Sequence, residues 1–247
     1  AMTAIDGCAF TDTRADYTGG GAIIEFNDAA TATTVTVANT TFTNASAITG
    51  DGNGFGGGLV AAYASTTQAA ATFILDTTFA NCRSDRDGGG AILTYPGPSH
   101  AAAAVRIAGT RFQGNNATTG GAGGGLNVQL AGNVTDASVD VQRSAFVGNS
   151  ADGVGGGGGL SIEMPQDDPL NLVFVGNPDS GVWFNQSSGD GQGNPPGNDD
   201  DQFDFQYPLT PNLKNPCESC GPFPNGCTSC PQFQPINTNS HPVNPLE

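Results

Sequence analysis

Residues 111–130 read RFQGNNATTGGAGGGLNVQL and contain both marks of a repeat that runs through most of the chain. One mark is a glycine run followed by a short apolar segment, and the other is a Phe followed closely by Asn or Asp. The first residues after the five glycine runs stand 37, 32, 35 and 34 residues apart; they are Ala22, Leu59, Ala91, Leu126 and Leu160. Two interleaved marks that share one period indicate a repeat architecture.

Each repeat contains two segments in which apolar residues alternate with other residues. The segments after the glycines read AIIEF, LVAAY, AILTY, LNVQL and LSIEM. Their first, third and fifth positions predict a buried face, and their second and fourth positions predict an outward face. A second alternating segment precedes the Phe from the second repeat on, with inward residues Val35, Val37, Thr72, Ile74, Val105, Ile107, Val139 and Val141.

A unit of this kind cannot bury its apolar face alone and has to stack on its neighbours. The sequence therefore predicts an all-β fold, a right-handed single-stranded parallel β-helix of about five to six coils over residues 1–188. A β-sandwich is the alternative, but it requires hairpin turns that the long glycine-rich connections do not resemble. Turn residues are expected three positions before each Phe, at Gly7, Asn39, Asp76, Gly109 and Arg143.

The end of the repeat is less regular than its beginning. Phe174 and Phe184 both compete for the Phe position of the last coil, and no glycine-led strand follows either of them. We therefore expect the coiling to end near residue 188. Residues 189–216 are rich in Pro, Gly and Asp, which predicts a linker.

Alternating FxxN and GGX motifs, with X an Ala, Leu or Ile, are typical of the chlamydial polymorphic membrane protein repeats, which the chain resembles from Phe10 to about Phe184. Phe112 to Asn115, Phe146 to Asn149 and Phe174 to Asn177 match FxxN in full, whereas the first three coils carry a shorter FxN or FxD form. The resemblance implies a secreted, right-handed β-helical passenger that is used for surface adhesion.

Residues 217–247 form a Cys- and Pro-rich stretch, which we expect to be an irregular tail packed on the β-helix or on a neighbour. In an extracellular chain, its closely spaced cysteines favour two disulfides among Cys217, Cys220, Cys227 and Cys230. Zinc bound by the two CxxC pairs is the alternative, although six residues between the pairs is short for a zinc ribbon, and free thiols are the third option. Cys8 and Cys82 belong to coils one and three, about 10 Å apart along the axis, beyond disulfide reach.

Charge and composition exclude several functions. The chain has 23 acidic and 7 basic residues, a net charge of −16, so neither nucleic acid nor anionic lipid is an expected partner. No apolar run approaches the ~18 residues of a membrane-spanning helix, so we expect no direct membrane insertion.

Two kinds of surface site are suggested by short motifs. Clustered carboxylate and amide side chains could bind calcium or could belong to solvated loops; they are Asp51, Asn53, Asp190, Asp199, Asp200, Asp201 and Asp204. Five sequons would accept N-glycans in a eukaryotic-type secretory route, at Asn39, Asn44, Asn116, Asn133 and Asn185, although Asn39 and Asn44 also suit corners. No other cofactor is expected.

The residues suited to catalysis are scattered. Arg106 and Asp140 should be neighbours on adjacent coils and neutralise each other, and carboxylates in glycine-rich loops should keep ordinary pKa values. We therefore expect a non-catalytic, extracellular or cell-surface protein for adhesion or surface display, whose partner is a protein or glycan on another surface. The expected contact surface comprises Glu25, Thr94, Gln129 and Glu163 with the loops Ala64–Ala71 and Tyr95–Ala104. A structural subunit of an extracellular filament or wall, built from copies of the chain, is the first alternative, and a polysaccharide lyase-like enzyme is the second.

Overall fold

The computed structural model describes residues 1–27, 32–64, 67, 69–96, 102–130, 137–154 and 158–163, and four later strands, 172–175, 181–183, 186–189 and 203–205. In this part of the chain every regular element is a β-strand, and every strand pair is parallel. No helix long and apolar enough to cross a membrane occurs among the described residues. The predicted parallel β-helix is confirmed, and the antiparallel sandwich is excluded.

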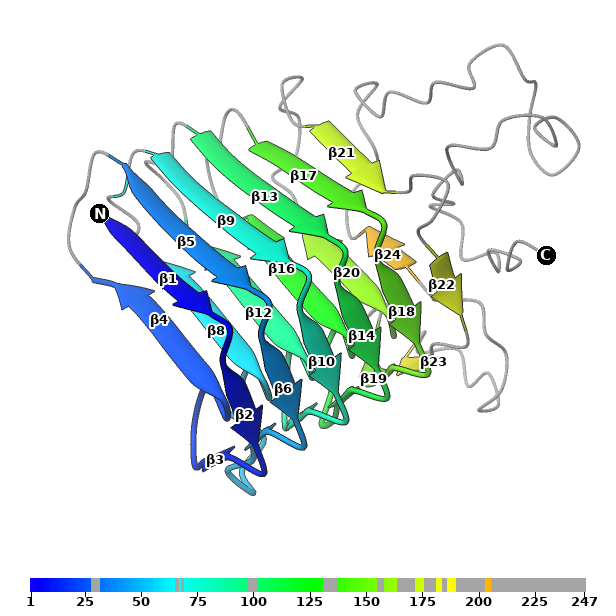
Figure 1. Ribbon diagram of the computed structural model, residues 1–247. Helices are drawn as coiled ribbons and strands as arrows, with labels where there is room; N and C mark the ends of the chain where they lie inside the picture. The colour runs from blue at the N-terminus through cyan, green and yellow to red at the C-terminus, as the bar shows by residue number, and fades with distance from the viewer. Residues whose placement is uncertain are drawn as a thin grey trace, which may run out of the picture.

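The strands form four sheets of six, and each strand pairs with the strand four places away in the chain (Figure 1). The first sheet contains β1 (Met2–Asp6), β5 (Thr33–Ala38), β9 (Ala69–Leu75), β13 (Ala102–Ala108), β17 (Ala137–Gln142) and β21 (Leu172–Val175). The second contains β2 (Ala9–Thr11), β6 (Thr41–Thr43), β10 (Thr78–Ala80), β14 (Arg111–Gln113), β18 (Ala145–Val147) and β22 (Gly181–Trp183).

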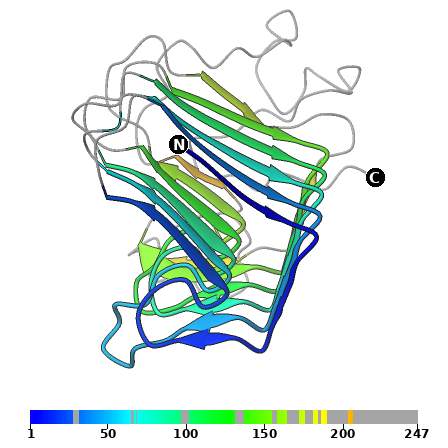
Figure 2. The same ribbon diagram turned by 60° about the vertical axis from the view of Figure 1, so that its left-hand side comes forward.

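The third sheet contains β3 (Arg14–Ala15), β7 (Ser46–Ala47), β11 (Arg83–Ser84), β15 (Asn116–Ala117), β19 (Ser150–Val154) and β23 (Gln186–Gly189). The fourth contains β4 (Ala22–Phe26), β8 (Leu59–Tyr63), β12 (Ala91–Tyr95), β16 (Leu126–Leu130), β20 (Leu160–Glu163) and β24 (Phe203–Phe205). Four consecutive strands make one coil, β1 to β4 the first and β21 to β24 the sixth, and the sheets surround a common interior (Figure 2). The short strands of the second and third sheets were not predicted.

The glycine-led strands stack in the predicted register. Ala22 pairs with Leu59, Leu59 with Ala91, Ala91 with Leu126, and Leu126 with Leu160. The last four of these residues are fully buried. The inward residues predicted for the first sheet are buried as well, so the core is a set of columns that run along the helix axis.

A column of Phe rings fills one corner of this core. Adjacent ring centroids are 4.8 Å apart and the rings are within 4° of parallel, through Phe10, Phe42, Phe79, Phe112 and Phe146. This spacing equals the distance between neighbouring strands of a sheet, so every ring stacks on the next without distortion of the backbone.

The glycine run and the Phe column are parts of one packing arrangement. A Cβ on the third glycine of a run would meet the Phe ring that faces it, for example at 2.9 Å for Gly58 and Phe79. The distance is 3.1 Å for Gly90 and Phe112, and also for Gly125 and Phe146. The two sequence marks therefore share a period because the rings lie against the glycine backbone.

The corner before each Phe has the predicted turn chemistry. Gly7, Asn39, Asp76, Gly109 and Arg143 all have positive φ, between 46° and 63°. The residue after this corner carries a hydroxyl in four coils, at Thr40, Thr77, Thr110 and Ser144. Each hydroxyl donates to the backbone carbonyl of the residue two positions before it, over 2.7–3.1 Å. The thiol of Cys8 makes the same contact with Asp6 at 3.3 Å.

The shorter FxN motif is not equivalent to FxxN, contrary to the sequence alignment. Asp12, Asn44 and Asn81 have φ of 53–54° and occupy the corner position of Gly114 and Gly148. The buried position of the full motif is held by Asn115 and Asn149 in the later coils, and by Thr13, Ala45 and Cys82 in the earlier ones.

The two buried asparagines bond the backbone of their neighbours. Oδ1 of Asn115 accepts from the Cys82 amide at 2.9 Å, and its Nδ2 donates to the Phe79 carbonyl at 3.0 Å. Asn149 repeats both contacts one coil later, with Asn115 and Phe112. These side chains therefore satisfy corner groups that would otherwise be buried without partners.

The last coil differs from the prediction in two ways. Phe146 pairs with Val182, so neither Phe174 nor Phe184 takes the Phe position, and Phe174 instead lies in β21 opposite Asp140. β24 pairs with β20 inside the stretch predicted as a linker, so the last described strand lies beyond the boundary placed at residue 188. The Cys-rich tail predicted at residues 217–247 lies outside the described residues.

We predict that Gly90→Ala destabilises the protein by about 2–3 kcal/mol, because the new methyl group would contact the carbonyl oxygen of Gly125 and lie 3.1 Å from Phe112. Gly7→Ala is the control, since Gly7 has φ +63° and open space around it, and should cost only about 1 kcal/mol of backbone strain. Urea unfolding followed by circular dichroism measures both. A larger loss for Gly7→Ala would contradict the packing of glycine against the Phe column.

Candidate functional site

The outer side of the fourth sheet is partly covered by the chain that leads into it. A Cβ on Gly88 would lie 2.8 Å from Cβ of Ile92, and one on Gly56 would lie 3.0 Å from Cγ2 of Ile92. The second strand positions, expected to face outward, are consequently buried at Val60, Ile92, Asn127 and Ser161. The fourth positions remain at the surface, and Thr94, Gln129 and Glu163 succeed one another there in register.

Two carboxylates converge on one amide at this surface. Nε2 of Gln129 on β16 donates to Oδ2 of Asp87 at 3.3 Å and to Oε1 of Glu163 at 3.4 Å, which places the two acceptor oxygens at most 6.7 Å apart. Asp87 lies in the turn between β11 and β12, and its Oδ1 accepts from the Ala122 amide at 2.8 Å. Glu163 ends β20, so the group joins three successive coils.

Both carboxylates have altered acidity. Burial raises the pKa of Asp87, against the lowering effects of the Ala122 amide, the Arg86 charge and Gln129. Burial also raises the pKa of Glu163, and the negative charge of Asp87 raises it further, whereas Gln129 and Asn127 lower it. The expectation that loop carboxylates keep ordinary pKa values is therefore wrong for Asp87.

Two neighbouring polar side chains are buried without partners. Asn127 and Ser161 pair in register on β16 and β20, each with no exposed surface. Within the described part of the chain, neither Nδ2 nor Oδ1 of Asn127 makes a full hydrogen bond, and neither does Oγ of Ser161. An unmet buried polar group costs about 1–3 kcal/mol. Sequence reasoning missed Asp87, Asn127 and Ser161 as site residues; the available signal was the change from apolar Ile23, Val60 and Ile92 to polar residues in one column.

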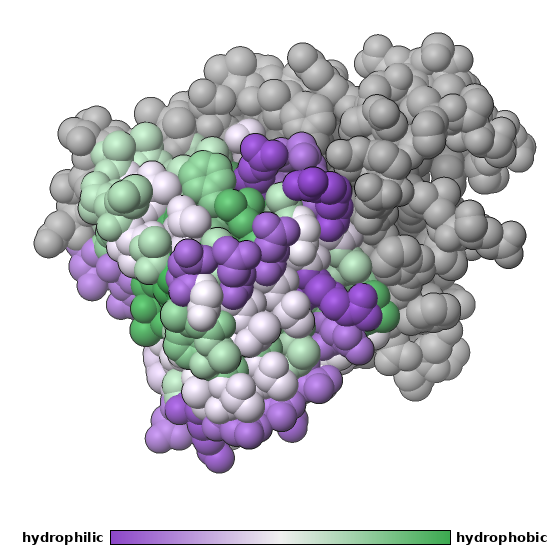
Figure 3. Space-filling view, in the orientation of Figure 1, coloured by the Kyte–Doolittle hydropathy of each residue, from purple (hydrophilic) through white to green (hydrophobic). Residues whose placement is uncertain are grey.

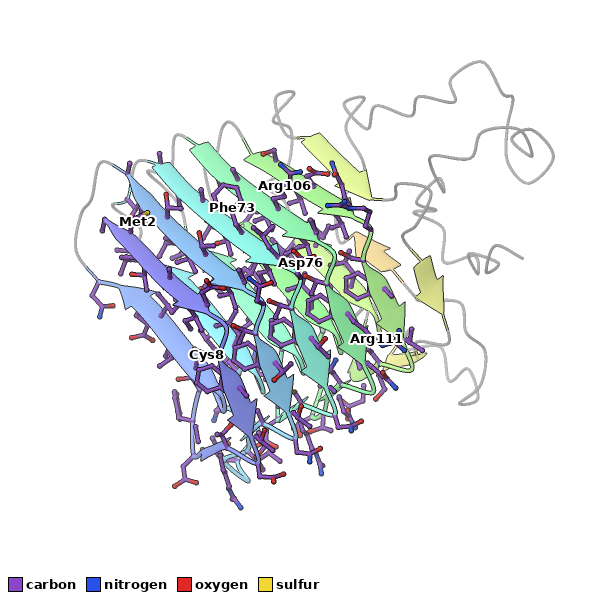
Figure 4. All side chains as sticks on the ribbon, viewed as in Figure 1. Met2, Cys8, Phe73, Asp76, Arg106 and Arg111 are labelled. Atoms are coloured by element: carbon purple, nitrogen blue, oxygen red, sulfur yellow. The ribbon has the colours of Figure 1, made fainter. Side chains whose placement is uncertain are left out.

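Arg106 and Asp140 are neighbours, as predicted. They pair in register on β13 and β17, and Nε of Arg106 lies 3.8 Å from Oδ2 of Asp140. Half of the Arg106 side chain is exposed, so solvent screens this ion pair. Figure 4 shows Arg106 and Phe73 on the first sheet, whereas the carboxylate pair belongs to the fourth.

The calcium candidates are divided between a described loop and the undescribed tail. The Asp51 carboxylate accepts from the Thr49 hydroxyl and from the Asn53 amide, which lowers its pKa and closes the loop on itself. Asp190, Asp199, Asp200 and Asp201 lie outside the described residues, and Asp204 occupies the register position next to Ser161. No three His, Cys, Asp or Glu side chains converge within the described part of the chain.

The remaining predicted site residues are also divided between the described and the undescribed parts of the chain. Asn39 and Asn44 are exposed corner residues whose Nδ2 atoms donate to Asp6 and Asp12 at 2.9 Å, and Asn116 lies in β15. Cys8 and Cys82 are free, as expected from their distance. Several predicted residues lie outside the described part of the chain: Asn133, Asn185, Cys217, Cys220, Cys227, Cys230, and residues 65, 66, 68 and 97–101 of the two long loops.

We predict that Glu163→Gln stabilises the protein at about pH 7 in EDTA and that this advantage disappears at about pH 3. The folded state retains the Glu163 proton above the ordinary pKa of 4.5, so wild-type stability falls as the pH rises through the raised pKa. Asp87, Gln129 and Asn127 are the groups that act on this carboxyl, and the Arg86 charge acts on Asp87. The measurement is the urea midpoint at both pH values, with Glu25→Gln, an exposed residue of β4, as the control. A destabilised Glu163→Gln at neutral pH would show that the carboxylate is not under repulsion.

Comparison with known proteins adds no identification: no family model, no curated protein and no solved structure matches this chain. The likeness to polymorphic membrane proteins therefore depends on the repeat motifs alone.

Proposed function

We propose that the protein is a non-catalytic, extracellular or cell-surface β-helix that acts in adhesion or surface display. The supporting observation is the contrast between its inward and outward columns. Inside, one corner position is occupied by Phe in each of the first five coils. Outside, one column of the first sheet changes from Thr36 to Phe73, Arg106 and Asp140 in successive coils.

A changing exterior on a repeated interior suits recognition of another molecule. Side chains of the outward column are held one strand spacing apart by the core, so different groups are displayed at fixed positions. Lateral packing of identical subunits into a filament would favour a repeated exterior instead. The varied exterior therefore favours recognition over assembly into a filament.

The outer side of the first sheet is the better contact surface. Phe73 is half-buried there between Thr36 and Arg106, and Arg and aromatic residues contribute most to binding at protein interfaces. Figure 3 shows that this face of the molecule mixes hydrophobic and hydrophilic areas, as recognition surfaces do. On the fourth sheet, by contrast, Gln129 and Glu163 are half-buried and bonded within the protein.

The test uses beads coated with the protein, applied to a glycan array and to immobilised extracellular-matrix proteins. We expect saturable binding to at least one probe. Phe73→Ala and Arg106→Ala should each weaken this binding about fivefold or more, as expected for residues at the centre of an interface. Tyr17→Ala is the control, because Tyr17 is an exposed aromatic residue away from the first sheet.

Two results would contradict the proposal. One is a wild-type protein that binds none of the probes while it is folded by circular dichroism. The other is equal loss of binding in Phe73→Ala and Tyr17→Ala, which would show that the first sheet is not the contact surface.

A polysaccharide-cleaving enzyme is the second candidate, and one observation favours it. Paired carboxylates of unequal surroundings can serve as acid and base, and glycosidases hold theirs about 5–9.5 Å apart. The acceptor oxygens of Asp87 and Glu163 are within 6.7 Å. Incubation with acidic and neutral polysaccharides should release no new reducing or unsaturated ends under the adhesion proposal. Release that Glu163→Gln abolishes, and Glu25→Gln does not, would reverse the order of the two candidates.

A further inference from the structure

The outer side of β16 and β20 contains polar groups that the fold itself does not use. Asn127 and Ser161 are completely buried, and none of their three side-chain polar atoms has a hydrogen-bond partner among the residues that the structure describes. A side-chain amide can make up to four hydrogen bonds. Groups of this kind in a folded protein call for an explanation, such as an ion or another bound ligand.

These unpartnered groups lie beside the carboxylate pair. Side chains two residues apart on a strand share a face, so Asn127 and Gln129 point to the same side of β16, and Ser161 and Glu163 to the same side of β20. The Asn127 amide interacts with the Glu163 carboxyl and lowers its pKa, but the contact falls short of the geometry of a full hydrogen bond. Asp87 completes the group from the turn before β12.

The chemistry of the group selects a cation. It offers two carboxylates, two side-chain amide oxygens and one hydroxyl, which are the hard oxygen donors that calcium prefers. The Arg86 guanidinium lies over the Phe55 ring, 5.4 Å from its centroid, rather than in an ion pair with the two carboxylates. The oxygen and nitrogen of Gln129 exchange places when its amide rotates by half a turn, which would present the oxygen to an ion.

We propose that Asp87, Gln129 and Glu163, together with the side-chain oxygen of Asn127, bind one Ca²⁺ ion on the outer side of the fourth sheet. The ion links coils three, four and five, because each of Asp87, Gln129 and Glu163 belongs to a different coil. In a solenoid, where each coil contacts only its neighbours, such a link strengthens the interfaces between coils. This inference is independent of the proposed recognition function.

Isothermal titration of the full-length, EDTA-treated chain with CaCl₂ tests the site. We expect a Kd of about 10⁻⁴–10⁻³ M, the range of extracellular calcium modules, and weaker binding of MgCl₂ because Mg²⁺ demands a stricter octahedral geometry. Asp87→Asn and Glu163→Gln should each weaken the binding about tenfold or more. Glu25→Gln removes the same kind of carboxylate from the same column, on β4, and should leave it unchanged.

Thermal unfolding supplies a second readout that separates this site from the acidic residues of the tail. With about 5 mM CaCl₂, well above the expected Kd, the melting temperature of the wild type and of Glu25→Gln should rise, and that of Glu163→Gln should not. The absence of calcium-dependent heat and of a melting shift in the wild type overturns the proposal. So does an equal calcium response in Glu163→Gln and Glu25→Gln, which would place the ion elsewhere in the chain.

Discussion

The match between the stacking distance of aromatic rings and the spacing of strands in a sheet governs this structure. Each Phe ring lies 4.8 Å from the next, and parallel strands repeat at about the same distance. The ring also lies against the third glycine of the run that faces it, where a methyl group would not fit. Stacked rings therefore require a glycine corner, and this requirement explains why the two marks occur together in every coil of the ring stack.

The sequence predicted the columns and the corner before each Phe, but not the corner after it. Column residues such as Leu59, Ala91 and Leu126 are recognised by apolar alternation, which depends only on burial. The corner of Asn81 resembles that of Asn115 in letters, yet Asn81 has positive φ and takes the place of Gly114. Asparagine suits both a left-handed corner and a buried hydrogen-bonding position, so its identity alone cannot distinguish them. Val182 shows the converse, because an aliphatic residue holds the register position next to Phe146, where Phe174 or Phe184 was expected.

The candidate site was predicted only in part, for a physical reason. Gln129 and Glu163 were expected at the surface because strand alternation turns them outward. Asp87 was not expected in this site, because its contact with Gln129 spans 42 residues and so does not follow the repeat of about 34. It depends on the path of the chain between the third and fourth sheets, which folds back over the outer side of the fourth sheet. That same path buries the second strand positions, which alternation alone assigns to solvent.

The second strand positions of the fourth sheet form one column, in which the residues change from apolar to polar along the helix axis. Ile23, Val60 and Ile92 occupy it in the first three coils; Val60 and Ile92 are buried against the covering chain, whereas Ile23 in the first coil is exposed. A buried apolar side chain there stabilises by about 1.5–3 kcal/mol, whereas an unpartnered amide or hydroxyl lowers stability. Asn127 and Ser161 thus replace a favourable residue type by an unfavourable one, beside two carboxylates that repel each other. Asn127, Ser161 and the carboxylate pair thus place three unfavourable choices in one part of the fourth sheet, which the stability of the fold alone does not explain.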